Sequence, residues 1–85
     1  MKQLQNILCL FLMLITITVS AQLDTLKLQR EARSLLREGN KLYNKQKFGD
    51  AAIAYRKALG KDSQYEKASY NFGNTLYQEK KYKEA

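Results

Sequence analysis

The chain is 85 residues long, so it holds one small domain at most. It has no histidine and a single cysteine, and its 15 Lys and Arg residues against 8 Asp and Glu give a net charge of +7. This composition excludes a disulfide framework and a metal site built from imidazole or thiolate ligands.

Residues 1–21, MKQLQNILCLFLMLITITVSA, have the pattern of a secretory signal peptide. A lysine precedes a 13-residue apolar run from Ile7 to Val19. Val19 and Ala21 give the A-x-A-like arrangement that signal peptidase accepts, so we expect cleavage before Gln22 and an exported, periplasmic product.

The alternative for this leader is an uncleaved inner-membrane anchor. It is less favoured because the apolar run is shorter than the roughly 20 residues that span a bilayer. Cys9 follows Leu8 rather than a small residue, so it does not resemble the acylated cysteine of a lipoprotein and is expected to leave with the leader.

Residues 22–85 keep 14 basic and 8 acidic residues, a net charge of +6. Acidic residues lie between the basic ones and no run of five or six like charges occurs, which is typical of a solvated basic surface. With export also expected, no nucleic-acid partner is predicted. A weak electrostatic contact with an anionic membrane stays open as an alternative, through Lys27, Arg30, Arg33 and Arg37 beside an amphipathic stripe.

Apolar residues at spacings of three and four predict a first helix from Leu26 to Lys45. Asp24 or Thr25 is its expected N-cap. A polar turn at residues 46–47 follows, and the same spacing then predicts a second helix. That helix carries Ala51, Ala52, Tyr55, Ala58 and Leu59.

Gly60 is expected to end the second helix because glycine tolerates the positive φ of a C-cap. Ser63 and Glu66 have the spacing of a capping box, which predicts the start of a third helix there. No proline and no alternating strand pattern occur, so the predicted class is all-α, with one helical hairpin and the beginning of another.

Two stretches 34 residues apart are nearly the same: GNKLYNKQKFGDA at 39–51 and GNTLYQEKKYKEA at 73–85. Average residue usage would give roughly one identity by chance. The identical pairs are Gly39/Gly73, Asn40/Asn74, Leu42/Leu76, Tyr43/Tyr77, Lys47/Lys81 and Ala51/Ala85. A fixed period of this length predicts a stacked array of repeats.

The sizes of the side chains predict how the two helices of one unit pack. Gly39 lets the neighbouring helix approach closely, and Ala51 and Ala58 do the same on the partner helix. Phe48 and Tyr55 are expected to fill the wedge between the helices, because packed interfaces set small residues opposite large ones.

The 34-residue unit resembles the tetratricopeptide repeat, a helix pair with a small residue in its first helix, an aromatic at the turn, and small and aromatic residues along its second helix. The matching residues are Gly39, Phe48, Ala51, Tyr55, Ala58 and Leu59 in the first unit and Gly73, Tyr82 and Ala85 in the second. Ser63 departs from the usual proline and Leu42 from a frequent aromatic.

The resemblance implies an antiparallel helix-turn-helix array. Residues 22–31 form a lead-in, residues 32–65 repeat 1, and residues 66–85 an incomplete repeat 2 that stops as its second helix should begin. Arrays usually need about three repeats and a cap, so we expect a piece of a longer protein. The alternative is a three-helix unit that self-associates through the open second repeat.

Tetratricopeptide arrays hold peptides or partner proteins in a groove lined by the first helix of each pair. The resemblance therefore implies a non-enzymatic protein-protein interaction scaffold. Its candidate partner-binding residues are Arg33, Leu36, Asn40, Tyr43 and Asn44 in the first unit and Lys67, Tyr70, Asn71, Asn74, Tyr77 and Gln78 in the second. The alternative is that the tyrosines are packing residues and the Asn40/Asn74 pair is structural.

Asparagine can donate to and accept from a peptide backbone, and tyrosine offers a flat apolar face with a polar tip. A carboxylate clamp is not predicted, because Leu36 stands where the first lysine of that clamp would be.

More distantly, the leader ending in SAQ and the stretch REGNKLYNKQKFGDAAIAYRKAL resemble the exported tetratricopeptide proteins of bacterial Bat aerotolerance clusters. This implies a scaffold that works with von Willebrand A-type partners. No cofactor and no metal are expected. An enzyme is disfavoured because Glu31, Glu38, Asp50 and Glu66 occupy ordinary solvated or capping positions without a paired arrangement.

Overall fold

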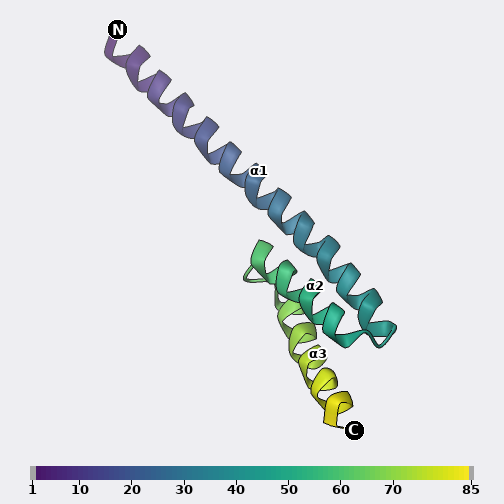
Figure 1. The fold of residues 1–85 in the computed structure, drawn as a ribbon. Coiled ribbons are helices and arrows are strands. Elements are labelled where there is room, and N and C mark those ends of the chain that lie inside the picture. Colours follow the sequence, from purple (N-terminus) through teal and green to yellow (C-terminus); the bar gives the residue numbers. More distant parts are fainter. Residues whose placement is uncertain (1, 85) are drawn as a thin grey trace.

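The computed structural model describes residues 2–84, apart from the side chain of residue 17. Ala85, the last matched position of the repeat, and Met1 of the leader lie outside the described residues. The described chain forms three helices: α1 (Lys2–Asn44), α2 (Phe48–Lys61) and α3 (Glu66–Glu84). Figure 1 shows α2 folding back along the C-terminal part of α1, and α3 folding back along α2. The predicted all-α class is confirmed.

The first helix does not begin at Asp24 or Thr25, as predicted. α1 runs unbroken through both residues, and the Thr25 hydroxyl donates to the carbonyl of Ala21, one turn back, at 3.0 Å. The physical reason is that no glycine or proline occurs before Gly39, so nothing interrupts the helix. The leader and the first helix of the repeat are thus one helix of 43 residues, about 65 Å long.

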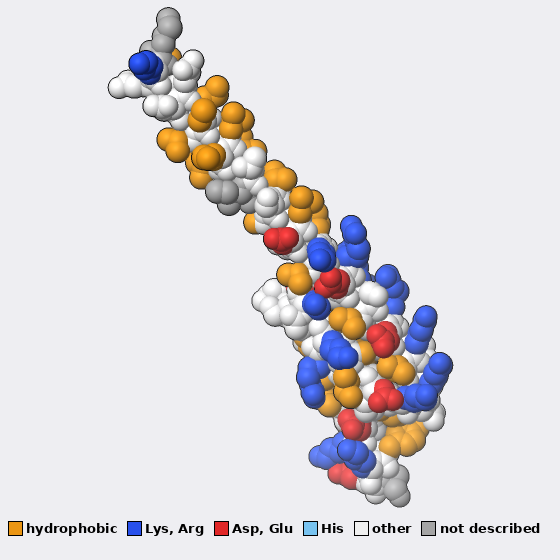
Figure 2. Space-filling view, turned by 45° about the horizontal axis from the view of Figure 1, so that its top comes forward, with side chains coloured by type: hydrophobic (Ala, Val, Ile, Leu, Met, Phe, Trp, Pro, Cys, Tyr) orange, Lys and Arg blue, Asp and Glu red, His pale blue; other side chains and the backbone are white. Residues whose placement is uncertain are grey.

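The N-terminal arm, residues 2–28, extends beyond the other helices (Figure 1). Its described side chains are exposed. Figure 2 shows hydrophobic side chains gathered along it, whereas charged side chains are frequent among the others on the rest of the face in view. An 18-residue window of α1 has a mean hydropathy of 2.0 and is 0% buried. By length and composition this helix is apolar enough to cross a membrane, a test that signal sequences also pass.

The core lies in the three-helix unit, residues 29–84, where α2 packs between α1 and α3. Its fully buried positions are mostly small: Ala32, Ala51, Ala58 and Ala68 are each 0% exposed. Small side chains let helix backbones approach closely, and the large Tyr55 side chain, 1% exposed, fills the space that they leave.

Gly39 makes room for the Tyr55 ring. A Cβ atom at Gly39 would lie 2.5 Å from Cε1 of Tyr55, closer than any real contact allows. The predicted small-opposite-large packing of α1 and α2 is therefore confirmed. At Gly73, the equivalent residue in the second unit, a Cβ atom would meet no packed neighbour within 4 Å.

An aromatic cluster joins the three helices at the end of the unit where α2 begins. The Phe48 ring centroid lies 5.1 Å from that of Tyr43 and 5.2 Å from that of Tyr82. Pairs of this kind contribute about 0.5–1.5 kcal/mol each beyond the area that they bury. At the opposite end of α2, the Lys61 ammonium lies 3.1 Å from the Glu31 carboxylate.

The end of α2 differs from the prediction. The helix continues through Gly60 to Lys61, and no glycine among the described residues has a positive φ. Asp62 is the C-cap instead, with extended backbone, and its N–H donates to the carbonyl of Ala58 at 3.0 Å. The left-handed conformation occurs at Gln46, φ 62°, in the predicted turn between α1 and α2.

The predicted capping box is also wrong. α3 begins at Glu66, so Ser63 lies within the turn and not at the N-cap position. The turn is instead closed by Asp62, whose carboxylate oxygen accepts from the backbone N–H of Gln64 at 3.2 Å.

α3 continues to Glu84, past the point where the first unit turns. Ion pairs one helical turn apart support this extension, with Lys83 3.2 Å from Glu79 and Lys80 4.0 Å from Glu84. The second unit therefore differs from the first at its turn.

The two repeat-related glycines give a matched stability test. Gly39→Ala is expected to lower the free energy of unfolding by about 1–3 kcal/mol, because the new methyl group would overlap the Tyr55 ring. Gly73→Ala is the control and should raise it by about 1 kcal/mol, since alanine favours the helix and meets no neighbour. Urea denaturation measures both. Equal stability of the two variants would show that the close approach at Gly39 is not a constraint.

Candidate functional site

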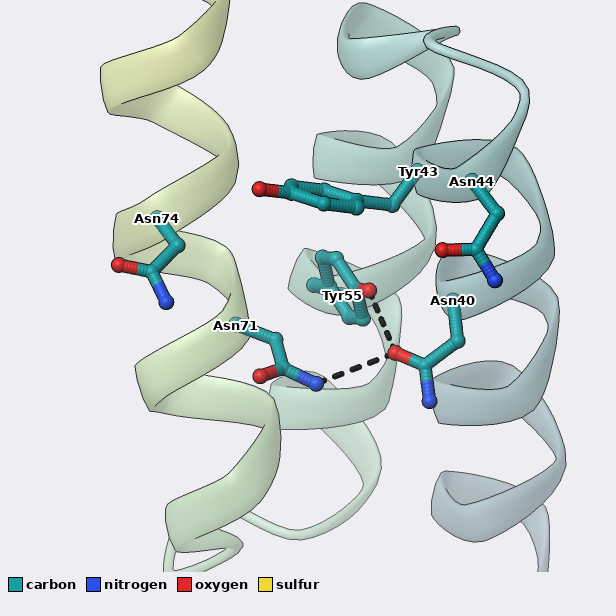
Figure 3. A pocket seen from close by; sticks show the side chains of 6 residues that line it. All are labelled: Asn40, Tyr43, Asn44, Tyr55, Asn71 and Asn74. Carbon is teal, nitrogen blue, oxygen red and sulfur yellow. Dashed lines mark hydrogen bonds between the residues drawn. The ribbon is translucent and has the colours of Figure 1, made fainter.

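A polar pocket of about 340 Å³ lies where the three helices meet. Its lining consists of four carboxamides and two phenols, groups that both donate and accept hydrogen bonds. They are Asn40, Tyr43 and Asn44 from α1, Tyr55 from α2, and Asn71 and Asn74 from α3 (Figure 3).

Helix periodicity explains why these residues meet. Asn40, Tyr43 and Asn44 are three and four residues apart on α1, so they share one face. Asn71 and Asn74 share a face of α3 for the same reason. α1 and α3 run in the same direction, with α2 packed against both (Figure 1). The pocket therefore takes its lining from the sides of α1 and α3 that face each other, and we call this surface the groove.

Asn40 is the centre of the hydrogen bonding in the pocket. Its Oδ1 accepts from the Tyr55 hydroxyl at 2.6 Å and from Nδ2 of Asn71 at 3.1 Å (Figure 3). One amide oxygen thus connects all three helices. Since a carbonyl oxygen has two lone pairs, both acceptor sites are used and the amide is held in one orientation.

The environment of Tyr55 keeps its hydroxyl protonated. Burial raises the pKa of Tyr55 above its usual 10.0, and the neighbouring Tyr43 acts in the same direction, whereas a hydrogen-bonding contact with the Asn71 amide opposes them. At neutral pH Tyr55 is therefore a donor to Asn40.

Five of the predicted partner-binding residues line the pocket: Asn40, Tyr43, Asn44, Asn71 and Asn74. Leu36 does not belong to the groove surface. It is 8% exposed and packs in the core with Ala51 and Tyr55, because it lies on the face of α1 that α2 covers.

The remaining predicted residues do not line this pocket. Arg33, Lys67, Tyr70 and Tyr77 are exposed on α1 and α3, and Gln78 is half-buried. Sequence reasoning placed Tyr55 only in the wedge between helices. A sequence signal for its second role exists, since a tyrosine buried among alanines needs a hydrogen-bond partner for its hydroxyl.

Comparison with known protein families, curated proteins and solved structures found no match to the chain. The resemblance to the tetratricopeptide repeat, and the weaker one to the Bat proteins, therefore stay predictions. Among residues 2–84, no three His, Cys, Asp or Glu side chains come together in a way that could hold a metal ion.

Removing the Tyr55 hydroxyl tests its bond to Asn40. Tyr55→Phe keeps the ring against Gly39 and leaves Asn71 as a donor to Asn40. We expect a loss of about 1 kcal/mol in the free energy of unfolding at pH 7, measured by urea denaturation.

The difference in the free energy of unfolding between wild type and Tyr55→Phe is also expected to depend on pH. The folded pKa of Tyr55 is raised, so its contribution to stability is complete below pH 10.0 and is lost as the pH rises through the folded value. The stability difference between wild type and Tyr55→Phe should therefore shrink above pH 10. A difference that stays constant with pH would contradict this assignment.

Proposed function

We propose that the chain is an exported, non-enzymatic scaffold that binds a peptide or protein segment in the groove between α1 and α3, in the manner of a tetratricopeptide repeat. The observation that carries this proposal is the pocket in that groove, to which the two repeat units contribute the equivalent residues Asn40 and Asn74. Hydrogen-bonding groups on neighbouring parallel helices suit an extended segment that crosses both.

The packing supports the same proposal. α2 lies between α1 and α3, so each helix contacts chiefly its neighbour in the sequence, as in stacked repeats. The Gly39 and Tyr55 contact places the small and large residues of the repeat against each other. Exposed aromatic side chains on α3, Tyr70 at 72% and Tyr77 at 67%, offer further contact area on the helix that carries Asn71 and Asn74.

The partner class follows from this surface. The pocket residues are neutral, and on the face that Figure 2 shows, acidic side chains lie among the basic ones of the three-helix unit. A protein or peptide partner is therefore proposed, without nucleic acid or cofactor. An aerotolerance scaffold of the Bat type is the finer form of the proposal, and it rests on the sequence resemblance alone.

The N-terminal arm supports export as a cleaved signal peptide. The exposure of its apolar side chains and the hydropathy of 2.0 also favour a second candidate, a membrane-anchored adaptor that keeps the arm. The two candidates share the groove and differ in what happens at Ala21.

Peptide binding tests the scaffold proposal. Peptides would be selected from a random phage library on the full chain in detergent micelles. Asn74→Ala combined with Tyr77→Ala is expected to weaken the selected peptides about ten-fold or more, since a ten-fold change corresponds to about 1.4 kcal/mol of lost contact. Asn40 is avoided because its bonds also hold the helices together.

The matched control is Ile53→Ala with Lys57→Ala, which changes a separate depression between α1 and α2. These substitutions should leave the dissociation constant unchanged. Selected peptides that bind the Asn74/Tyr77 variant as tightly as wild type would remove the groove from the proposal.

Replacement of Ala21 distinguishes the two fates of the arm. In the wild type, mass spectrometry of the native protein should give an N-terminus at Gln22. Ala21→Arg removes the small residue that signal peptidase requires, so the variant should keep residues 1–21 and sediment with membranes. Wild-type protein that keeps these residues in the membrane fraction would establish the anchored adaptor instead.

A further inference from the structure

Two amides in the pocket, those of Asn40 and Asn71, form a hydrogen-bonded pair in which Asn71 is the donor and Asn40 the acceptor. Asn71 donates through Nδ2 to Oδ1 of Asn40, and the Tyr55 hydroxyl donates to the same oxygen. Figure 3 shows that the dashed lines leave two atoms of this pair unused, Nδ2 of Asn40 and Oδ1 of Asn71. The pair thus offers a ligand one donor at Asn40 and one acceptor at Asn71.

The Asn71 amide and the Tyr55 hydroxyl together favour one orientation of the Asn40 amide. Rotation of this amide by 180° would break the bonds that the Tyr55 hydroxyl and the Asn71 NH2 donate to its oxygen, and would bring the NH2 groups of Asn40 and Asn71 together. In this arrangement the donor open to a ligand is at Asn40 and the acceptor is at Asn71, beside a tyrosine that is 1% exposed.

The pocket lining contains no charged side chain. All six lining residues are neutral amides or phenols, and the raised pKa of Tyr55 keeps it so. A carboxylate entering this pocket would lose hydration without gaining a cation, which is costly. It would also bring two acceptor oxygens to a pair that presents an acceptor of its own.

We propose that the pair formed by Asn40 and Asn71 selects a neutral carboxamide and rejects a carboxylate. The ligand carbonyl accepts from Nδ2 of Asn40, and a ligand N–H donates to Oδ1 of Asn71. This inference rests on the proposed function, because it names the chemical class that the groove takes. The carboxamide belongs to a peptide backbone or to an Asn or Gln side chain, rather than to a C-terminal carboxylate.

Three small probes test this selection. Acetamide represents a side-chain amide, N-methylacetamide a backbone amide, and acetate is nearly isosteric with acetamide but charged. Each is titrated at equal ionic strength into the full chain in micelles, and the side-chain NH2 signals of Asn40 and Asn71 are followed by NMR. The exposed Gln64 amide, outside the pocket, is the internal control.

An amide probe is expected to shift the Asn40 and Asn71 signals with an affinity about ten-fold above that of acetate, as one mispaired hydrogen bond predicts. Whichever amide binds more tightly identifies the source as side chain or backbone. The net charge of +7 attracts acetate, so bulk electrostatics cannot produce this preference. Acetate binding at least as tight as the better amide, or no shift beyond that of Gln64 with any probe, overturns the proposal.

Two hydroxyl deletions refine the test. Tyr55→Phe removes one of the two donors that hold the Asn40 amide. The ratio of the amide affinity to the acetate affinity should therefore fall toward one. Tyr82→Phe removes a hydroxyl that lies outside the pocket lining and leaves the pair intact, so the preference should persist. A preference that survives Tyr55→Phe unchanged would overturn the role given to Tyr55.

Failure of the amide selection can be distinguished from failure of the scaffold proposal. Selected peptides that depend on Asn74 and Tyr77, together with a preference for acetate, would leave the scaffold standing and remove the selection. Absence of both groove-dependent peptides and probe binding would remove both.

Discussion

The contact between Tyr55 and Gly39 is the constraint on which the three-helix unit depends. The ring occupies the space that any other side chain at Gly39 would fill, so α1 and α2 can approach only with glycine at this position. The approach also carries the Tyr55 hydroxyl to Asn40, whose oxygen in turn accepts from Asn71 on α3. Packing of the first hairpin and formation of the pocket are therefore consequences of the same contact.

This arrangement explains why a polar pocket can exist in so small a unit. A buried hydroxyl costs stability unless it is hydrogen-bonded, and Asn40 satisfies it while keeping its own NH2 group free. The amide thus serves the fold through one atom and the groove through the other. Substituting Asn40 would affect both, whereas Asn74, on the exposed side of the pocket, can be changed with less effect on the packing.

Much of the fold could be predicted from the spacing of residues. Apolar positions three and four apart gave the helices, and the repeat gave the glycine and tyrosine that pack together. The helix ends were harder, because a cap residue such as Asp24 or Ser63 indicates only where a helix can begin. Strong helix formers on both sides of Asp24 continue the helix instead. The position of Leu36 could not be read from spacing, because it lies four residues before Asn40 and yet packs in the core with Ala51 and Tyr55.

The bonds of the pocket could not be derived in the same way. Sequence periodicity places Asn40 and Asn71 on helix faces, but the choice of Oδ1 as a double acceptor depends on where the Tyr55 hydroxyl arrives. That position results from the depth to which the ring enters beside Gly39. Only the three-dimensional packing contains this information.

The unbroken α1 has a geometric consequence for as long as the arm remains attached. A continuous helix fixes both the distance and the rotation about its axis between the arm and the groove. The direction in which the groove opens therefore depends on how the arm is oriented about that axis. Each residue of helix between them turns that direction by about 100° and moves it by about 1.5 Å. The number of residues in the arm therefore sets the direction, about the helix axis, in which the groove faces relative to a surface that holds the N-terminus.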